Sequence, residues 1–158
     1  TGGRTELLLF QAATPRALAE LEVPGEVASL HFAPDEKRFL VVSRTVWGGT
    51  AHCTLFEGVT KLSSFDAHLV KSPYDFPDAA SLVWSPDGNH LALLRADSSI
   101  EIATPSGERR ASFAAPKTQG EVGLMFVTKD RLALIGQQEL VVLDTRGEPV
   151  MRFEVEHA

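Results

Sequence analysis

The segment Ser81–Leu94, which reads SLVWSPDGNHLALL, constrains the fold of this chain more than any other stretch. Its first residues alternate with the period of a strand, and Leu82 and Trp84 lie on the more deeply buried face. The tetrad Ser85–Gly88 then ends this strand, because proline presets φ, aspartate bonds its own backbone and glycine accepts a positive φ. The apolar run Leu91–Leu94 returns as a second strand. The segment therefore predicts a β-hairpin.

Two further segments repeat this pattern. His31–Leu40 (HFAPDEKRFL) keeps an aromatic strand end and an Ala-Pro-Asp turn, and Met125–Leu134 (MFVTKDRLAL) keeps the apolar frame. The aromatic residues Phe32, Trp84 and Phe126 follow one another at spacings of 52 and 42 residues. Units of roughly 40–50 residues with several short strands are typical of β-propeller blades. We expect these three aromatic side chains to occupy equivalent buried positions between adjacent blades.

The element Ser81–Ala92 resembles the F/W-S-P-D-G-x-x-L-A element of WD-repeat-like β-propellers. None of the three copies holds the Gly-His pair or the Trp-Asp dipeptide of the strict WD repeat, so the resemblance is to a divergent propeller. It covers nearly the whole chain and implies an all-β fold. It implies no particular activity, because propellers host unrelated activities.

The rest of the chain divides into short apolar strands separated by turns. Residues 1–25 offer two strands, which match the third and fourth strands of a blade, whereas residues 26–66, 79–115 and 120–157 offer four strands each. We therefore expect an all-β β-propeller segment of about three and a half four-stranded blades, in a single domain or part-domain. A helix over Pro15–Glu22 is the alternative for part of the first segment, because alanine and leucine favour helices.

This number of blades has a consequence for assembly. Propellers usually close with roughly four to eight blades, and an open arc leaves unpaired strand edges, which folded proteins avoid. We expect the chain to be part of a larger propeller or to be completed by another chain, which includes a homo-oligomer. A closed four-bladed ring, in which the N-terminal segment recruits extra strands, is the third alternative.

The outer strands of the expected blades share two recurring features. The turns at residues 106–108 and 146–148 both contain Gly-Glu at equivalent places. The outer strands end on Phe65, Phe113 and Phe153. These repeats indicate that the three segments are built as the same four-stranded unit.

The composition narrows the class of partner. Of 158 residues, 44% are hydrophobic and 23% are charged, which is typical of a soluble globular domain, and no apolar run reaches the ~18 residues of a membrane span. The net charge of −6 argues against a nucleic-acid partner, because phosphate-binding surfaces are usually basic. The single cysteine, Cys53, and the absence of a leader sequence favour a cytoplasmic location.

No motif in the sequence carries recognisable catalytic or metal-binding chemistry. The five histidines lack the spacing of metal ligands, and we interpret His31 and His52 as partly exposed residues of strands. Cys53 follows His52 directly, but neighbours along a strand point to opposite faces, so we interpret Cys53 as a small core residue. The sequence has no G-x-S-x-G element, Walker loop or G-x-G-x-x-G loop. We therefore expect no catalytic residue, cofactor or metal site.

Charged and aromatic residues occur in loops that a propeller would place on one face. In such a fold, the connectors between second and third strands lie on the same face as those between blades. Aromatic residues on loops are common anchors at interfaces, although these could equally fold back over a blade. The candidate partner-binding residues in these loops are Arg44, Trp47, Lys71, Tyr74, Phe76, Arg95 and Lys117.

The leading interpretation is a non-catalytic propeller scaffold that mediates protein–protein interaction within a larger assembly. One alternative is the propeller domain of a hydrolase whose catalytic domain is not in this sequence. Another is a sensor propeller that binds a small ligand. A periplasmic or extracellular propeller is a third alternative, which a leader upstream of Thr1 would indicate.

Overall fold

The computed structural model describes residues 4–10, 17–44, 50–69, 81–117 and 123–154. In these ranges every regular element is a strand, and the strands form one two-stranded sheet and three four-stranded antiparallel sheets. The expected all-β architecture with four-stranded units is confirmed.

The two-stranded sheet, called the N-terminal pair below, consists of β1 (Arg4–Phe10) and β2 (Ala17–Pro24). Leu7 lies opposite Leu21 in its antiparallel register. The alternative of a helix over Pro15–Glu22 is wrong for the described residues from Ala17 onward. Strand pairing and apolar contacts override the modest helix propensity of alanine and leucine here.

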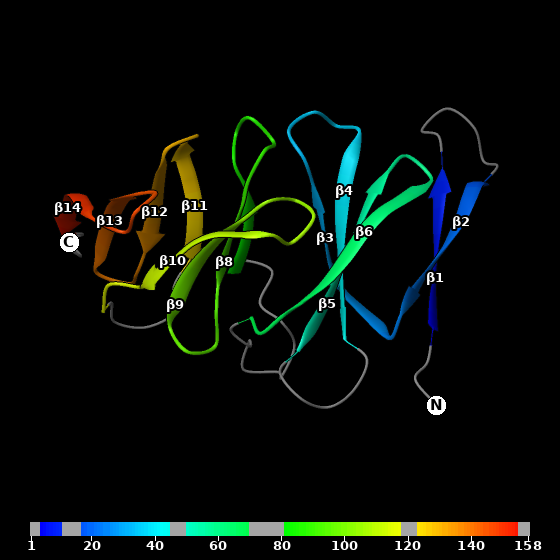
Figure 1. The fold of residues 1–158 in the computed structure, drawn as a ribbon, viewed down its shortest axis with the longest axis horizontal. Helices are drawn as coiled ribbons and strands as arrows, with labels where there is room; N and C mark the ends of the chain where they lie inside the picture. Colours follow the sequence, from blue (N-terminus) through cyan, green and yellow to red (C-terminus); the bar gives the residue numbers. More distant parts are fainter. Residues whose placement is uncertain (1–3, 11–16, 45–49, 70–80, 118–122, 155–158) are drawn as a thin grey trace.

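The three four-stranded sheets are called the first, second and third blade. The first blade holds β3 (Glu26–Phe32), β4 (Arg38–Arg44), β5 (Ala51–Glu57) and β6 (Thr60–Ala67). The second holds β7 (Leu82–Trp84), β8 (Leu91–Leu94), β9 (Ser99–Ala103) and β10 (Arg109–Ala114). The third holds β11 (Gly123–Thr128), β12 (Arg131–Ile135), β13 (Glu139–Asp144) and β14 (Pro149–Glu154). Strands lie in chain order within each blade, and the blades stand side by side (Figure 1).

The second blade is buried on both faces, which explains the continuous apolar run Leu91–Leu94. Leu91 and Leu93 pack with side chains of the first blade, whereas Ala92 and Leu94 pack with side chains of the third. Successive residues of a strand point to opposite faces, so a strand between two blades needs apolar residues at every position.

The turn after β7 forms as its residues predict. Gly88 has a φ of 68°, which confirms that this turn places its glycine in the left-handed region. The Ser85 hydroxyl donates to Asp87 Oδ1 at 2.6 Å, and the backbone N–H of His90 donates to Ser85 Oγ at 2.9 Å. The hairpin is therefore closed by the side chains of the turn itself.

Polar contacts join this turn to the first blade. The Trp84 indole Nε1–H donates to the backbone carbonyl of His31 at 3.1 Å. The Arg38 guanidinium lies over the Trp84 ring, with Cζ 5.6 Å from the ring centroid, and donates to the carbonyl of Gly88 at 2.9 Å. Arg38 Nε also donates to Asp35 Oδ2 at 2.6 Å. Arg38 thus holds the β3–β4 and β7–β8 turns together.

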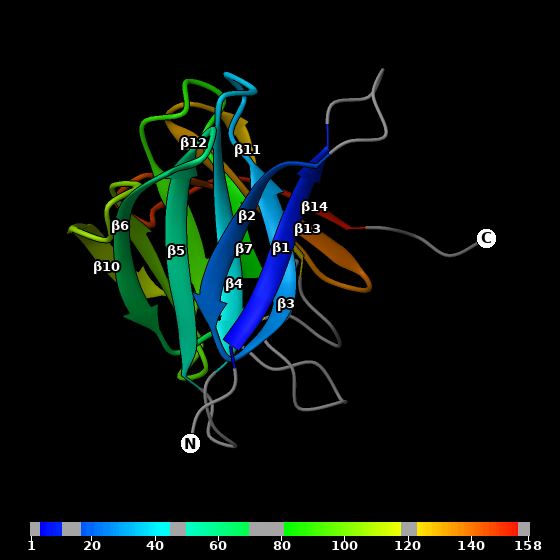
Figure 2. The same cartoon turned by 90° about the vertical axis from the view of Figure 1, so that its right-hand side faces the viewer.

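The expected equivalence of Phe32, Trp84 and Phe126 is correct for the backbone and wrong for the burial of Phe32. Phe32 and Trp84 are the last residues of β3 and β7, and Phe126 lies two residues before the end of β11. Each pairs with the start of the second strand of its blade. Phe126 is buried, and Trp84 is half-buried against the core. Phe32 is 65% exposed. The N-terminal pair packs against β3 and β4 but leaves the end of β3 at Phe32 uncovered. Figure 2 shows β1 and β2 crossing this side of the first blade obliquely.

Candidate interaction surfaces

Three surfaces of the described chain are candidates for contact with a partner. The connector face is the end of the molecule that carries Arg44, Arg95 and Lys117. The first-blade face is the uncovered part of β3, with Leu30 and Phe32. The last-blade face is the outward side of the third blade and includes the exposed residues Met125, Ile135, Met151 and Phe153.

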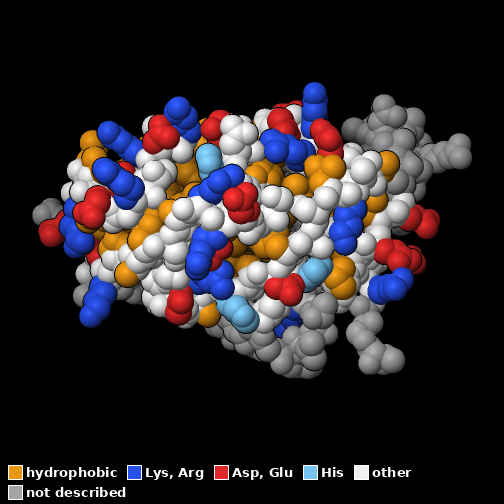
Figure 3. Space-filling view, in the orientation of Figure 1, with side chains coloured by type: hydrophobic (Ala, Val, Ile, Leu, Met, Phe, Trp, Pro, Cys, Tyr) orange, Lys and Arg blue, Asp and Glu red, His pale blue; other side chains and the backbone are white. Residues whose placement is uncertain are grey.

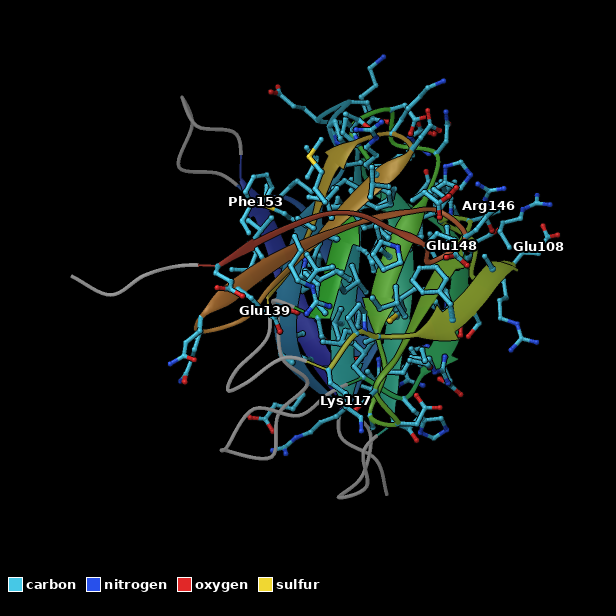
Figure 4. All side chains as sticks on the ribbon, turned by 90° about the vertical axis from the view of Figure 1, so that its left-hand side faces the viewer. Glu108, Lys117, Glu139, Arg146, Glu148 and Phe153 are labelled. Carbon is cyan, nitrogen blue, oxygen red and sulfur yellow. The ribbon has the colours of Figure 1, made fainter. Side chains whose placement is uncertain are left out.

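Backbone hydrogen bonds bring the described parts of the connectors together. The N–H of Ala96 donates to the carbonyl of His68 at 3.0 Å, and the N–H of Ala115 donates to the carbonyl of Ser98 at 2.9 Å. Three connectors, which follow β6, β8 and β10, therefore meet at one end of the blades. Figure 4 shows Lys117 at this end.

The candidate residues on the connector face differ in what they offer a partner. Arg44 is paired with Glu26 at 2.9 Å, and Arg95 is paired with Glu101 at 2.7 Å. Both arginine side chains are largely covered, so they stabilise their own blades, whereas Lys117 is exposed. The remaining candidates lie outside the described residues: Trp47, Lys71, Tyr74 and Phe76.

The first-blade face exposes residues whose counterparts are buried elsewhere. Leu30 is 46% exposed, whereas Leu82 and Leu124, at the same strand position, are 1% and 4% exposed. Phe32 is likewise exposed, whereas Phe126 is only 8% exposed. The neighbouring blade covers β7 and β11, but the N-terminal pair does not cover this part of β3.

The N-terminal pair instead covers the other part of the first blade. Leu21 and Val23 of β2 form a buried cluster with Phe39, Val41 and Phe56. Phe39 and Phe56 stack with ring centroids 5.3 Å apart. The two strands thus act as an incomplete neighbour, which buries part of the blade face and leaves Leu30 and Phe32 exposed.

The last-blade face presents an apolar row. Met125, Ile135, Met151 and Phe153 are 45%, 39%, 46% and 53% exposed. The strand registers match them to residues of the second blade that pack in the core against the third blade, which are Val83, Leu94, Ala111 and Phe113. The third blade therefore carries on this side the kind of apolar side chains that the second blade buries. Among the described residues, no further blade covers them.

The titratable groups inside the first blade show no sign of a reactive centre. Cys53 is fully buried as expected, and burial raises the pKa of its thiol to about 12, which keeps it protonated and unreactive. His52 Nδ1 lies 2.7 Å from Asp66 Oδ1 at the surface. His31 bonds to the Ser29 hydroxyl, and burial lowers the pKa of its imidazole. In the described ranges, no three His, Cys, Asp or Glu side chains gather as metal ligands would.

A hollow of about 260 Å³ lies between the second and third blades. Its charged residues Arg110 and Lys129 lie next to acidic partners, Glu108 at 3.2 Å and Asp130 at 3.8 Å. On the side seen in Figure 3, positive and negative side chains are interspersed. None of the described residues forms a helix that could cross a membrane.

Comparison with known proteins identifies the fold. No family model and no curated protein sequence matches this chain. Among solved structures it is similar to Hsv2 of Kluyveromyces lactis, with a TM-score of 0.68 and 12% identity over 98% of this chain and 56% of that chain. The fold is that of a WD-repeat-like β-propeller.

Two further propellers show the same similarity. The C-terminal WD40 domain of Sif2 has a TM-score of 0.65 at 18% identity, covering 90% of this chain and 40% of that one. BamB from Moraxella catarrhalis has a TM-score of 0.61 at 14% identity, covering 90% of this chain and 42% of that one. The chain spans about half the length of these structures, so it corresponds to part of a propeller ring.

The two end faces were not identified as candidate sites from the sequence. A signal for the last-blade face was present, since Phe153 repeats Phe65 and Phe113 at the end of an outer strand. The sequence alone places each of these residues at the same position of its four-stranded unit. Only the spatial order of the blades shows that Phe153 has no blade beside it among the described residues.

Proposed function

We propose that this chain is a non-catalytic scaffold that binds protein partners within a larger propeller assembly. The observation that carries the proposal is the exposure of core-type side chains on both end faces. Phe32 and Phe153 are 65% and 53% exposed, at positions that a neighbouring blade covers elsewhere in the molecule. Contiguous exposed apolar surface marks sites of protein interaction in soluble proteins.

The backbone of the N-terminal pair supports the same proposal. Among the described strands, β1 pairs only with β2, so its other edge is available for a further strand. An extended segment added to such an edge gains main-chain hydrogen bonds without requiring special side chains. Further strands here would also extend over the neighbouring β3, where Leu30 and Phe32 are exposed.

The connector face is the surface that the assembled scaffold would present to another protein. Lys117 is exposed there, and we assign Trp47, Lys71, Tyr74 and Phe76 to the same contact surface. Aromatic and basic residues on adjacent loops are common anchors of interfaces. We also propose a cytoplasmic location, because the only cysteine is a buried thiol rather than part of a disulfide.

The proposal is tested by affinity capture with the tagged chain in extract from its source organism. Phe32→Lys and Met151→Lys place a charge on each end face, and Val59→Lys is the matched control, because Val59 is 57% exposed in the β5–β6 turn. We expect proteins that bind the unchanged chain and the control to be lost with a face variant. Equal binding to all variants would exclude both end faces as the binding surface and leave the connector face, whereas no retained protein would contradict the scaffold.

A further inference from the structure

The outer strands contact the next blade through one repeated feature, a phenylalanine side chain that packs directly against a glycine. A methyl group added at Gly107 would lie 2.6 Å from Phe65 Cβ, and one added at Gly147 would lie 2.8 Å from Phe113 Cβ. Atoms cannot approach this closely, so only glycine leaves room for these phenylalanines. Phe65 therefore packs against the second blade, and Phe113 packs against the third blade.

The two glycines occupy the same kind of turn. Gly107 and Gly147 have φ values of 90° and 89°, and each donates its N–H to the carbonyl three residues earlier. The first residue of each turn, Thr104 or Asp144, accepts the N–H of the residue four positions later through its side-chain oxygen. Both turns thus follow the pattern Thr/Asp-x-x-Gly-Glu, and glycine is favoured by its φ as well as by the close contact.

Phe153 occupies the third position of this series. The rows Val42–Cys53–Phe65, Leu94–Ile100–Phe113 and Ile135–Leu140–Phe153 are cross-strand neighbours in the three blades. The first two phenylalanines are partly buried against the core, whereas Phe153 is 53% exposed. Figure 4 shows Phe153 near the free end of β14, and Arg146 and Glu148 mark the turn that holds Gly147.

We infer that the last-blade face binds a further propeller blade whose outer turn has the pattern Thr/Asp-x-x-Gly. Phe153 then packs against the glycine of that turn. The inference rests on the proposed function and specifies the partner of one of its two faces. The existing interfaces support it, because the exposed row of the third blade repeats the row that the second blade buries.

A second copy of this chain does not offer such a turn in its N-terminal pair. The residues that connect β1 to β2 are Gln11–Arg16, and they contain no glycine. Gly58 of the first blade lies in a tighter turn between β5 and β6, and its N–H donates to the carbonyl of Lys37. The fitting occupant is therefore a blade of different sequence from the N-terminal end of this chain.

The test measures how fast a thiol at position 153 reacts with a maleimide reagent. One form is the natural chain with Phe153→Cys, and the other is extended after Glu154 by a second copy of residues 115–154. The added blade then brings its own copy of Gly147 to position 153. Phe113→Cys is the matched internal control, and the native Cys53 is fully buried.

We expect fast labelling at position 153 in the natural chain and labelling at least about tenfold slower in the extended chain, because a packed interface must open before the reagent enters. Changing the added glycine to valine should restore fast labelling, while circular dichroism still shows the added strands. The Phe113→Cys control should label slowly both in the unextended chain and in the extended chain.

Three outcomes would overturn the inference. Fast labelling in an extended chain with a folded added blade would show that the face does not dock it. An added blade that stays unfolded would show that the glycine turn is insufficient. Protection in the natural chain, accompanied by a dimer in light scattering, would identify a second copy as the occupant. In the first two cases the scaffold could still bind through the first-blade face, which the capture experiment with Phe32→Lys tests separately.

Discussion

The first strands of the first and third blades carry the same apolar pair in different surroundings. In β11, Leu124 and Phe126 are 4% and 8% exposed, because they pack on the second blade. In β3, Leu30 and Phe32 are 46% and 65% exposed, because the N-terminal pair covers another part of the face. The comparison shows that the alternation in a strand sets the face on which an apolar side chain lies. Whether that side chain is buried depends on whether a neighbouring blade covers that face.

The largest expected effect separates the two phenylalanines of this comparison. Phe126→Ala should destabilise the protein by about 3–5 kcal/mol, because it removes buried apolar surface and leaves a cavity. Phe32→Ala should cost less than about 0.5 kcal/mol, which is usual for exposed positions. Urea denaturation of both variants measures the difference. Equal losses would show that β3 is covered in solution.

The second prediction compares a turn whose glycine packs against a phenylalanine with a turn whose glycine has no such contact. Gly147→Ala should cost about 2–4 kcal/mol, because the methyl group meets Phe113 and the backbone is left-handed. Gly58→Ala is the matched control, since Gly58 has a φ of 56° but no neighbouring atom where the methyl group would lie. Its cost should be about 1–2 kcal/mol, from the backbone alone. Thermal unfolding of both variants tests this, and a smaller loss at Gly147 than at Gly58 would argue against the close contact.

The third prediction concerns the polar link between the first and second blades. Arg38→Met keeps much of the side-chain length but removes the hydrogen bond to Gly88, the contact with Trp84 and the pair with Asp35. We expect a loss of about 1–2 kcal/mol. Lys37→Met is the control, because Lys37 is exposed in the same turn and should lose little. If the two variants unfold at the same denaturant concentration, the link contributes nothing to blade packing.

The smallest expected effect is a dependence of stability on acid pH. Hydrogen bonds from Arg38 and Lys37 lower the pKa of Asp35 from 3.8 to about 2. The unfolded chain therefore binds a proton at Asp35 before the folded chain does, and the stabilisation from the carboxylate falls as the pH drops from 3.8 to about 2. Asp35→Asn should flatten this part of the stability profile, because the variant lacks the contribution of the carboxylate above about pH 5 and has less stability to lose as the pH falls. A variant with the same acid dependence as the natural chain would assign the effect to other carboxylates, such as Asp87 and Asp144.

The sequence by itself determined the local structure, because the conformation of a turn or a strand depends mainly on residues that are neighbours in the chain. The Ser85–Gly88 turn, the alternation in β7 and the fully apolar run Leu91–Leu94 each specify a backbone conformation through neighbouring residues. Repetition of this unit was sufficient to predict four-stranded sheets and a propeller. The interpretation of Cys53 as a core residue needed only its position on a strand.

The candidate surfaces could be predicted only in part, because they depend on which blades are neighbours. The sequence predicted Arg95 and Lys117 in connectors at one end, but it could not show that Glu101 pairs with Arg95. Phe32 and Phe153 each resemble core residues in sequence, and only the tertiary structure shows that both are exposed. Burial of apolar surface is a property of two packed elements, so a strand specifies the face it offers, whereas the arrangement of blades decides which faces remain open for a partner.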